Sequence, residues 1–279
     1  MSPFTATRPD ISYAVGRLSS FLDGFRLEHW EAAVRVLRYL KGTRSFALTL
    51  GGKNSLAISG YSDSDYANCI DTSRSIGGYC FVFDSGMISW SSKKQTTVAD
   101  SSCYAEYIAL HSASYEVVFL RQLLEGLRFL LSGPTQLLCD NDAASRLSED
   151  HVWHSHSKHI RVKYHYAREL VLNGDVSISR VGSKDNTADI FTKPLPCADF
   201  QRLRYYLGVR ALDAASHAQG GVFPVILFRR SVFSQSVFSR FLIIDLFSST
   251  RVYPYHHTIP ISYFTISTSL LFGFITFEL

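Results

Sequence analysis

The chain has 279 residues, enough for one or two domains with a buried core. Its formal net charge of +4 is compatible with a polyanionic partner such as nucleic acid, but it is too small to indicate one alone. The five cysteines show no CxxC pair and no zinc-like spacing, and their odd number, with four of them inside apolar runs, favours buried reduced thiols in a cytoplasmic or nuclear protein. The opening residues, MSPFTATRPD, lack a basic region followed by an apolar stretch, so we expect no signal peptide.

Residues 1–54 are expected to form two helices that support the fold and carry no reactive group. Thr7 is predicted to cap the first helix, with Pro9 in its opening turn. The second helix is predicted over about His29–Leu40, where apolar residues recur at helical spacing, and Gly42 is its expected C-terminal stop.

Residues 55–210 are predicted to form an α/β domain in which helices flank a mixed sheet. The element order is β-β-β-α-β-α-α-β-α, and the turn Asp84-Ser85-Gly86 predicts a hairpin between the second and third strands. The five predicted strands are Leu56–Ser62, Gly78–Phe83, Met87–Ser91, Gln136–Cys139 and Val176–Val181. The predicted helices are Ser102–Leu131, a short one after Asn141, and Val162–Leu172.

Residues 211–279 differ from the rest in composition, because they hold ten of the twenty Phe and no Lys. Their apolar residues occur in clumps without a sustained period of 2 or 3.6, so we expect a poorly ordered hydrophobic extension or translated non-coding sequence. Ile259–Leu279 is long enough to span a bilayer, but Pro260 and six Ser or Thr residues make a membrane anchor the weaker alternative.

Four acidic residues stand where an α/β fold would bring carboxylates together. Asp63 follows an apolar run and Asp140 ends a predicted central strand, whereas Glu106 lies in the expected first turn of the long helix and Asp189 opens a short helical stretch. Each acid alone has an ordinary explanation as a turn or helix cap. Together they indicate a site for hard divalent cations, since Mg²⁺ takes oxygen ligands. We expect the neighbouring Asp65 to point to the opposite face from Asp63, so that only one of them can face the site.

Longer motifs support this interpretation. In chain order they are TRPDISYAV (7–15), HWEAAVRVLRYLKGT (29–43), GYSDSDYAN (60–68), TSRSIGGYCFVF (72–83), ISWSSKKQTTVADSS (88–102), AEYIAL (105–110), LLCDNDAA (137–144), SKHIRVKYHYARELV (157–171) and ADIFTKPL (188–195). In this order they resemble the end of reverse transcriptase and the following ribonuclease H (RNase H) domain of copia-type retrotransposon Pol polyproteins. The resemblance covers roughly residues 5–210.

The resemblance implies three parts: a C-terminal remnant of reverse transcriptase at 1–54, an RNase H-like domain with a mixed five-stranded sheet at 55–210, and the extension at 211–279. It further implies hydrolysis of the RNA strand of an RNA–DNA hybrid with two Mg²⁺ ions, or Mn²⁺ as an alternative. One ion would activate a water and the other would stabilise the departing 3′-oxygen. The implied catalytic and metal-binding acids are Asp63, Glu106, Asp140 and Asp189. No YxDD motif occurs, so we expect no polymerase activity.

Departures from the family pattern leave a second hypothesis open, a catalytically decayed remnant that binds nucleic acid or serves only a structural role. Cys103 and Tyr104 replace the usual Thr-Glu pair before Glu106, and Asp142 replaces a common Gln near Asp140. The partners implied in either case are an RNA–DNA hybrid and the rest of a Pol polyprotein.

Basic residues in the matched motifs are candidates for contacts with the phosphates of the hybrid. A solvated surface position is the alternative for each of them, and Lys93 and Lys94 are expected in a loop. His159 lies in a histidine-rich stretch whose spacing fits no standard zinc site. The candidates are Lys93, Lys94, Lys158, His159 and Lys193.

Overall fold

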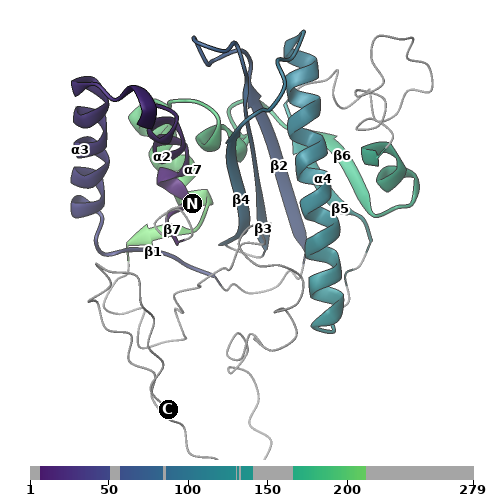
Figure 1. The fold of residues 1–279 in the computed structure, drawn as a ribbon. Coiled ribbons are helices and arrows are strands. Elements are labelled where there is room, and N and C mark those ends of the chain that lie inside the picture. Colours follow the sequence, from purple (N-terminus) through teal and green to yellow (C-terminus); the bar gives the residue numbers. More distant parts are fainter. Residues whose placement is uncertain are drawn as a thin grey trace, which may run out of the picture. The chain divides into compact units, whose positions relative to one another are not determined.

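A five-stranded mixed sheet forms the centre of the protein in the computed structural model (Figure 1). Its strands are β2 (Ile58–Asp65), β3 (Ile76–Phe83), β4 (Gly86–Lys94), β5 (Thr135–Cys139) and β6 (Val176–Arg180). In space they follow the order β4-β3-β2-β5-β6, where β3 runs antiparallel to β2 and β4, and β5 runs parallel to β2 and β6. The predicted mixed five-stranded sheet is therefore confirmed. The structure describes residues 7–50, 57–83, 86–129, 131, 133–140 and 166–211.

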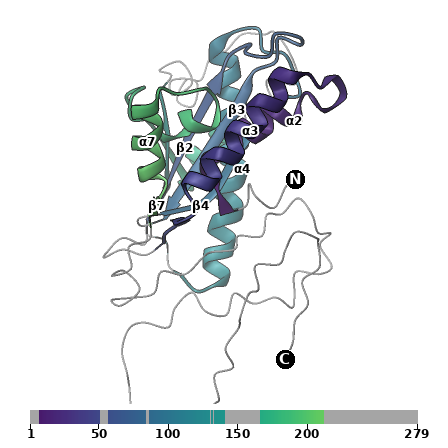
Figure 2. The same cartoon turned by 90° about the vertical axis from the view of Figure 1, so that its left-hand side faces the viewer.

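The sheet has an apolar core on each face, because neighbouring side chains of a strand point to opposite sides. On β3, Phe81 packs into a core with Leu110 of the long helix α4, whereas Cys80 packs into a second core with Phe191 and Leu203. Figure 2 shows α4 behind the sheet and α2, α3 and α7 in front of it. The elements of the second face are η3 (Thr187–Phe191), α7 (Cys197–Tyr206) and a two-stranded sheet of β1 (Phe46–Leu48) and β7 (Val209–Ala211).

Helix α4 spans Ser102–Gly126 and is shorter than predicted, since the sequence pattern extends it to Leu131. Its N-cap is Ser101, whose hydroxyl accepts a hydrogen bond from the Tyr104 backbone at 3.2 Å. The first turn of α4 contains no acidic residue, so the expectation that Glu106 lies there is wrong. Glu106 lies one turn further along, on the side that packs against the sheet.

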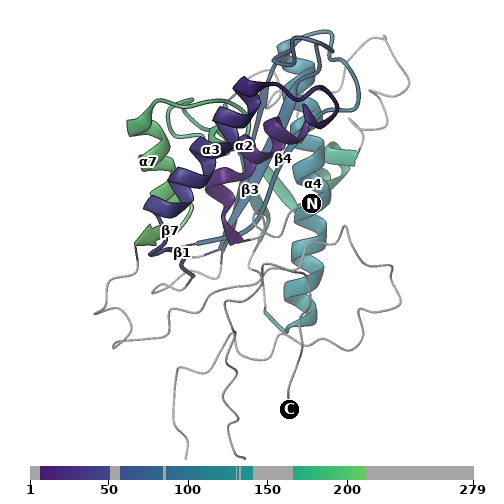
Figure 3. The ribbon, with the colours of Figure 1, turned by 60° about the vertical axis from the view of Figure 1, so that its left-hand side comes forward.

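Within residues 8–50, the N-terminal segment contains two α-helices and two short 3₁₀ turns. Pro9 opens the first turn as predicted, but the N-cap is Arg8 rather than Thr7, and no side chain caps that turn. Gly42 is the last helical residue of its helix and not a stop beyond it, because Thr43 is the C-cap. Figure 3 shows α2 beside β4 and α3 alongside α2. The elements are η1 (Pro9–Ile11), α2 (Ser12–Ser19), η2 (Leu22–Gly24) and α3 (Leu27–Gly42).

A buried carboxylate ties this segment to the end of the domain. Asp10 is 4% exposed and accepts hydrogen bonds from Arg8 Nη2 at 2.8 Å and from the Tyr39 hydroxyl at 2.5 Å. The Tyr39 oxygen in turn accepts a bond from Arg204 Nη1 at 3.1 Å, and Arg204 lies on α7. Three segments that are distant in sequence therefore share one hydrogen-bond network.

Several predicted features fall outside the described residues. They are turn residues 84–85, the short helix after Asn141, the start of the Val162–Leu172 helix, and the extension at 212–279 with its Ile259–Leu279 segment. Residues 166–172 are helical, in agreement with the later part of that predicted helix. Within the described ranges, no helix has the length and apolar character needed to cross a membrane.

Replacing Tyr39 by Phe removes only the hydroxyl at the centre of the network. We expect the free energy of unfolding to fall by about 1–2 kcal/mol, because Asp10 and Arg204 each lose a partner. Tyr206→Phe, at a position that is 56% exposed, is the matched control and should stay within about 0.5 kcal/mol of the wild type. Urea denaturation of the full chain measures both values, and equal effects of the two variants would contradict this role of Tyr39.

Candidate metal centre

Two of the four acids are brought together by the parallel pairing of β2 and β5. The register pairs Tyr61 with Leu138, and Asp63 and Asp140 each lie two residues further along. The carboxyl ends of parallel strands meet at the same edge of a sheet, where ligands of α/β folds bind. Asp63 is 1% exposed, and Asp140 directly follows β5.

The third acid, Glu106, reaches this edge from α4. Gln95 connects the two elements, since its Nε2 donates to the Ser64 hydroxyl at 3.2 Å and to the Ala105 carbonyl at 2.8 Å. Glu106 also forms a hydrogen bond with the Ser64 backbone. One carboxylate oxygen from each of Asp63, Glu106 and Asp140 lies within 4.8 Å of the others. These are distances that a single cation can bridge.

The fourth acid, Asp189, is carried by η3, which Asn186 fastens to the sheet. The Asn186 side chain accepts a bond from Ala188 N at 3.2 Å and donates one to the Ser62 carbonyl at 3.0 Å. Asp189 is not a member of the group of three within 4.8 Å, but the charges of Asp63 and Asp140 act on it. Asn186 did not stand out in the sequence, although an Asn directly before a short helix is a signal for such a cap.

Two residues that follow η3 contact the acids directly. The Thr192 hydroxyl donates to Asp63 Oδ2, and it is fully buried. The Lys193 ammonium lies 3.0 Å from Asp189 Oδ1 and 3.7 Å from Asp63 Oδ2. Lys193 was a candidate for phosphate contacts, but in the structure its ammonium is paired with carboxylates.

Gly78 allows η3 to lie this close to the sheet. It pairs with Asp63 across β2 and β3. A Cβ at Gly78 would lie 2.8 Å from Phe191 Cβ and 2.8 Å from Thr192 Cγ2, closer than side-chain carbons pack. The missing side chain therefore makes room for the Thr192 hydroxyl over Asp63.

The expectation that the side chains of Asp63 and Asp65 point to opposite faces of the sheet is wrong. Side chains two residues apart in a strand point to the same face, so both acids point toward η3 and α2. They differ in depth: Asp63 is buried, whereas Asp65 ends the strand, is partly exposed and accepts a bond from Asn68 Nδ2. Its charge acts on Tyr13 of α2. The two acids therefore differ in their position along the strand and not in the face of the sheet to which they point.

Two of the other basic candidates lie in β4, and the remaining two lie outside the described residues. Lys93 and Lys94 end the strand, so their expected placement in a loop is wrong. Lys93 is exposed, and Lys94 Nζ donates to Cys69 Sγ at 3.6 Å. Lys158 and His159 belong to the stretch 141–165 that the structure does not describe.

Burial and mutual repulsion disturb the protonation of the acids. Burial, with the charges of Asp63 and Asp140, raises the pKa of Glu106 to about 9. Burial and Asp63 raise the pKa of Asp189 to about 7, although Lys193 acts in the opposite direction. Burial also raises the pKa of Asp63, against Lys193 and Thr192. Burial lowers the pKa of Lys193, but the charges of Asp63 and Asp189 outweigh it and the net shift is upward.

The cluster fits a divalent cation. Within the part of the chain that the structure describes, Glu106 Oε2 is buried and has no hydrogen-bond partner. A buried carboxylate oxygen without a donor is costly unless a cation or a proton satisfies it. The ligand atoms are all oxygens, which is the donor set that Mg²⁺ and Mn²⁺ prefer.

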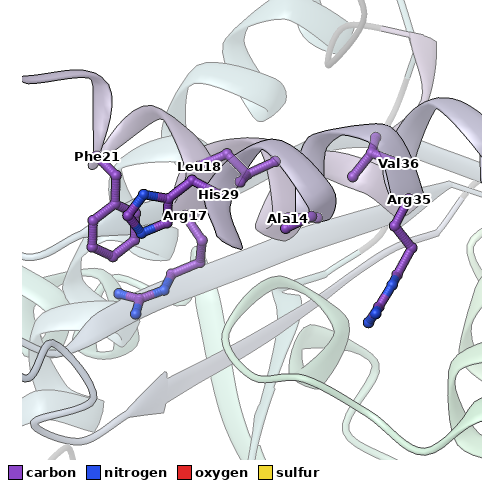
Figure 4. Close-up of a pocket in the computed structure, with 8 residues that line it drawn as sticks. Ala14, Arg17, Leu18, Phe21, His29, Arg35 and Val36 are labelled. Atoms are coloured by element: carbon purple, nitrogen blue, oxygen red, sulfur yellow. The ribbon is translucent and has the colours of Figure 1, made fainter. Parts of the chain in front are cut away.

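A pocket of about 300 Å³ lies elsewhere, between α2 and α3 (Figure 4). Phe21 stacks on His29 at one end of it, with ring centroids 4.3 Å apart, and Leu18 and Val36 line it further along. None of the four acids lines this pocket.

The sheet order and the acids at its edge define an RNase H-like fold, as the sequence predicted. The N-terminal RNase H domain of a Mycobacterium tuberculosis protein is similar to 53% of this chain, with 96% of that domain covered, at 14% identity and a TM-score of 0.38.

Sequence relatives identify the family. The chain is 38% identical over 211 residues to the retrovirus-related Pol polyprotein from transposon TNT 1-94 of Nicotiana tabacum, a match that covers 76% of the chain. It is 41% identical over 203 residues to the corresponding polyprotein from transposon RE2 of Arabidopsis thaliana, covering 73% of the chain. The chain therefore belongs to the retrovirus-related Pol polyproteins of copia-type transposons. It spans only 16% and 14% of the length of these two relatives, and no family model matches it.

Gly78→Ala should disturb the attachment of η3 to the sheet. We expect a loss of about 1–3 kcal/mol in the free energy of unfolding, because the added methyl overlaps Phe191 and Thr192. Gly126→Ala is the matched control, since nothing lies within 4 Å of a Cβ at that position, and it should leave stability unchanged or raise it by up to about 1 kcal/mol. Similar losses in both variants, measured by urea denaturation, would contradict the close-packing role of Gly78.

The raised pKa of Glu106 predicts a pH-dependent stability of the metal-free protein. The folded state holds the proton more tightly than the unfolded state, whose pKa is near 4.5. This contribution is complete below about pH 4.5 and is lost as the pH rises toward 9. Glu106→Gln should match the wild type in EDTA near pH 4.5 and be the more stable protein at pH 8, as measured by thermal unfolding. A difference between the two that does not change with pH would contradict the raised pKa.

Proposed function

We propose that this chain is an RNase H-type endonuclease that hydrolyses the RNA strand of an RNA–DNA hybrid with two Mg²⁺ ions, or Mn²⁺ in their place. Asp63, Glu106, Asp140 and Asp189 are the proposed metal-binding and catalytic residues. The observation that carries the proposal is the convergence of three carboxylates from β2, α4 and β5 within 4.8 Å. Membership of the Pol polyprotein family and the RNase H-like fold support this proposal.

The chain's own residues have separate roles in this proposal. Asp63, Glu106 and Asp140 supply the ligand oxygens, and their positions are set by strand pairing and by the Gln95 bridge. Thr192 holds one oxygen of Asp63 in place. When bound, Mg²⁺ supplies Lewis-acid chemistry, which makes a coordinated water a nucleophile and stabilises charge on the leaving oxygen.

The two residues that depart from the family pattern before Glu106 leave the proposed metal centre intact. With Cys103 and Tyr104 in place of the usual Thr-Glu pair, Ser101 still caps α4 through the Tyr104 backbone. The capped helix delivers Glu106 to the cluster. Catalytic decay is the second hypothesis, and the intact cap at the start of α4 does not favour it.

The flanking segments, the partner and the cellular location of the domain also belong to this proposal. We infer that residues 1–54 derive from the end of reverse transcriptase, that 211–279 are an extension, and that the rest of a Pol polyprotein is a partner. An intracellular, cytoplasmic or nuclear, location also stays a prediction. Within the described residues, β1 of the first part pairs with β7, with Phe46 opposite Ala211.

Single substitutions of Asp63 or Asp140 by Asn should abolish cleavage of a labelled RNA–DNA hybrid by the full chain in Mg²⁺. Because the acids act as a unit, we expect each loss to be at least about 1,000-fold, with little further loss in the double variant. Asp185→Asn is the matched control, since that side chain is 76% exposed and pairs only loosely with Arg202 at 3.6 Å. It should retain activity.

The outcomes separate the two hypotheses. Cleavage by the wild type that disappears in both Asn variants supports the endonuclease. Hybrid binding without cleavage by a folded wild-type chain, unchanged in the Asn variants, would support the decayed remnant.

A further inference from the structure

Lys193 is a cationic side chain whose charged group lies against two of the proposed metal-binding acids. Its ammonium is 3.0 Å from Asp189 Oδ1 and 3.7 Å from Asp63 Oδ2. The backbone fixes the point from which this side chain starts, since Lys193 N donates a hydrogen bond to the Asp189 carbonyl at 3.2 Å. The hydroxyl of the preceding Thr192 donates a hydrogen bond to Asp63. The position of the ammonium is therefore built into the turn that follows η3.

The charges around this ammonium explain why it lies there. Like-charged carboxylates that are buried close together repel one another, and a cation placed between two of them reduces that repulsion. Asp63 contributes a carboxylate with 2% of its side chain exposed, and Asp189 one with 11%. Both are shielded from water, so a cation supplied by the protein replaces part of the lost solvation.

The same position conflicts with a metal ion on this side of the cluster. A divalent cation that binds Asp63 and Asp189 would face the ammonium across the same carboxylate oxygens. The two positive charges repel at that separation, so both cannot keep their contacts. The Lys193 side chain is 34% exposed and ends a flexible chain of methylene groups, so it can withdraw toward solvent.

We propose that Lys193 is an internal counter-ion of the metal-free centre that competes with Mg²⁺ for Asp63 and Asp189 and leaves them when the metal binds. This inference rests on the proposed function, since it needs a metal at the four acids. It gives Lys193 a role as a positioning residue that sets the metal affinity of the centre. Part of the negative charge of the centre is then neutralised without metal, at the expense of weaker metal binding.

The direct test is calorimetric titration of the full chain with MgCl₂ and with MnCl₂, in the absence of nucleic acid. Lys193→Met keeps an unbranched side chain, one atom shorter, and removes its charge. We expect its metal dissociation constant to be at least about fivefold lower than that of the wild type. Lys193→Arg, which keeps the charge, should remain close to the wild type. Lys184→Met removes a charge at an exposed position nine residues away and should change the affinity little.

The outcomes distinguish this inference from the proposed function. Unchanged or weaker binding by Lys193→Met, with normal binding by the wild type, would overturn the competition and leave the metal centre standing. Absence of binding by the folded wild type at millimolar Mg²⁺ or Mn²⁺ would refute the proposed metal centre and the competition with it.

A measurement on the wild type alone tests the proposal even if Lys193→Met does not fold. The lysines are acetylated briefly in EDTA or in MgCl₂, and the modified peptides are quantified by mass spectrometry. Release of the ammonium predicts faster labelling of Lys193 in Mg²⁺, whereas labelling of Lys184 should not change. Equal or slower labelling of Lys193 in Mg²⁺ would overturn the proposal.

Discussion

Repulsion among buried carboxylates is the constraint on which the organisation of this domain depends. Asp63 and Glu106 are 1% and 8% exposed, and both lie close to Asp140 at the edge of the sheet. Without a cation, such groups can lower their repulsion only by taking up protons or by pairing with a positive side chain. The raised pKa values of Glu106 and Asp189 and the ion pairs of Lys193 are these two responses. The fold must supply enough stability elsewhere to hold the acids together.

The restraints that hold the acids come from separate parts of the chain. Parallel pairing of β2 with β5 aligns Asp63 with Asp140, and Gln95 joins the end of β2 to the start of α4. On the other face, Asn186 and Gly78 allow η3 to lie against the sheet. The Asp10 network then connects α7, which follows η3, to the N-terminal helices. Each restraint joins segments distant in sequence, so the geometry of the cluster depends on the tertiary fold.

This dependence explains which features the sequence could predict. Alternating or continuous apolar runs predicted every strand of the central sheet, and helical periodicity predicted α4, because these patterns are local. The four acids were recognisable from the order of the motifs, and Asp63 and Asp140 also from their positions at strand ends. Their spatial grouping follows from strand pairing, which the α/β pattern implies.

The features that were missed depend on contacts between distant segments. Gly78 and Thr192 have a role only because η3 packs over β3, and β1 pairs with β7 across about 160 residues through strands of three residues each. The predicted C-terminal end of α4 and the predicted placement of Lys93 and Lys94 were wrong, because helix and strand boundaries respond to capping and to neighbouring strands. The error about Asp65 was one of strand alternation, which the sequence alone could have avoided.

We propose above that Asp63, Glu106 and Asp140 form one divalent-metal centre. Anomalous diffraction from crystals of the full chain soaked in MnCl₂ can show whether a metal binds there. We expect an anomalous peak at about 2.0–2.6 Å from carboxylate oxygens of these three acids. Occupied manganese sites elsewhere on the protein, with no peak at this cluster, would contradict it.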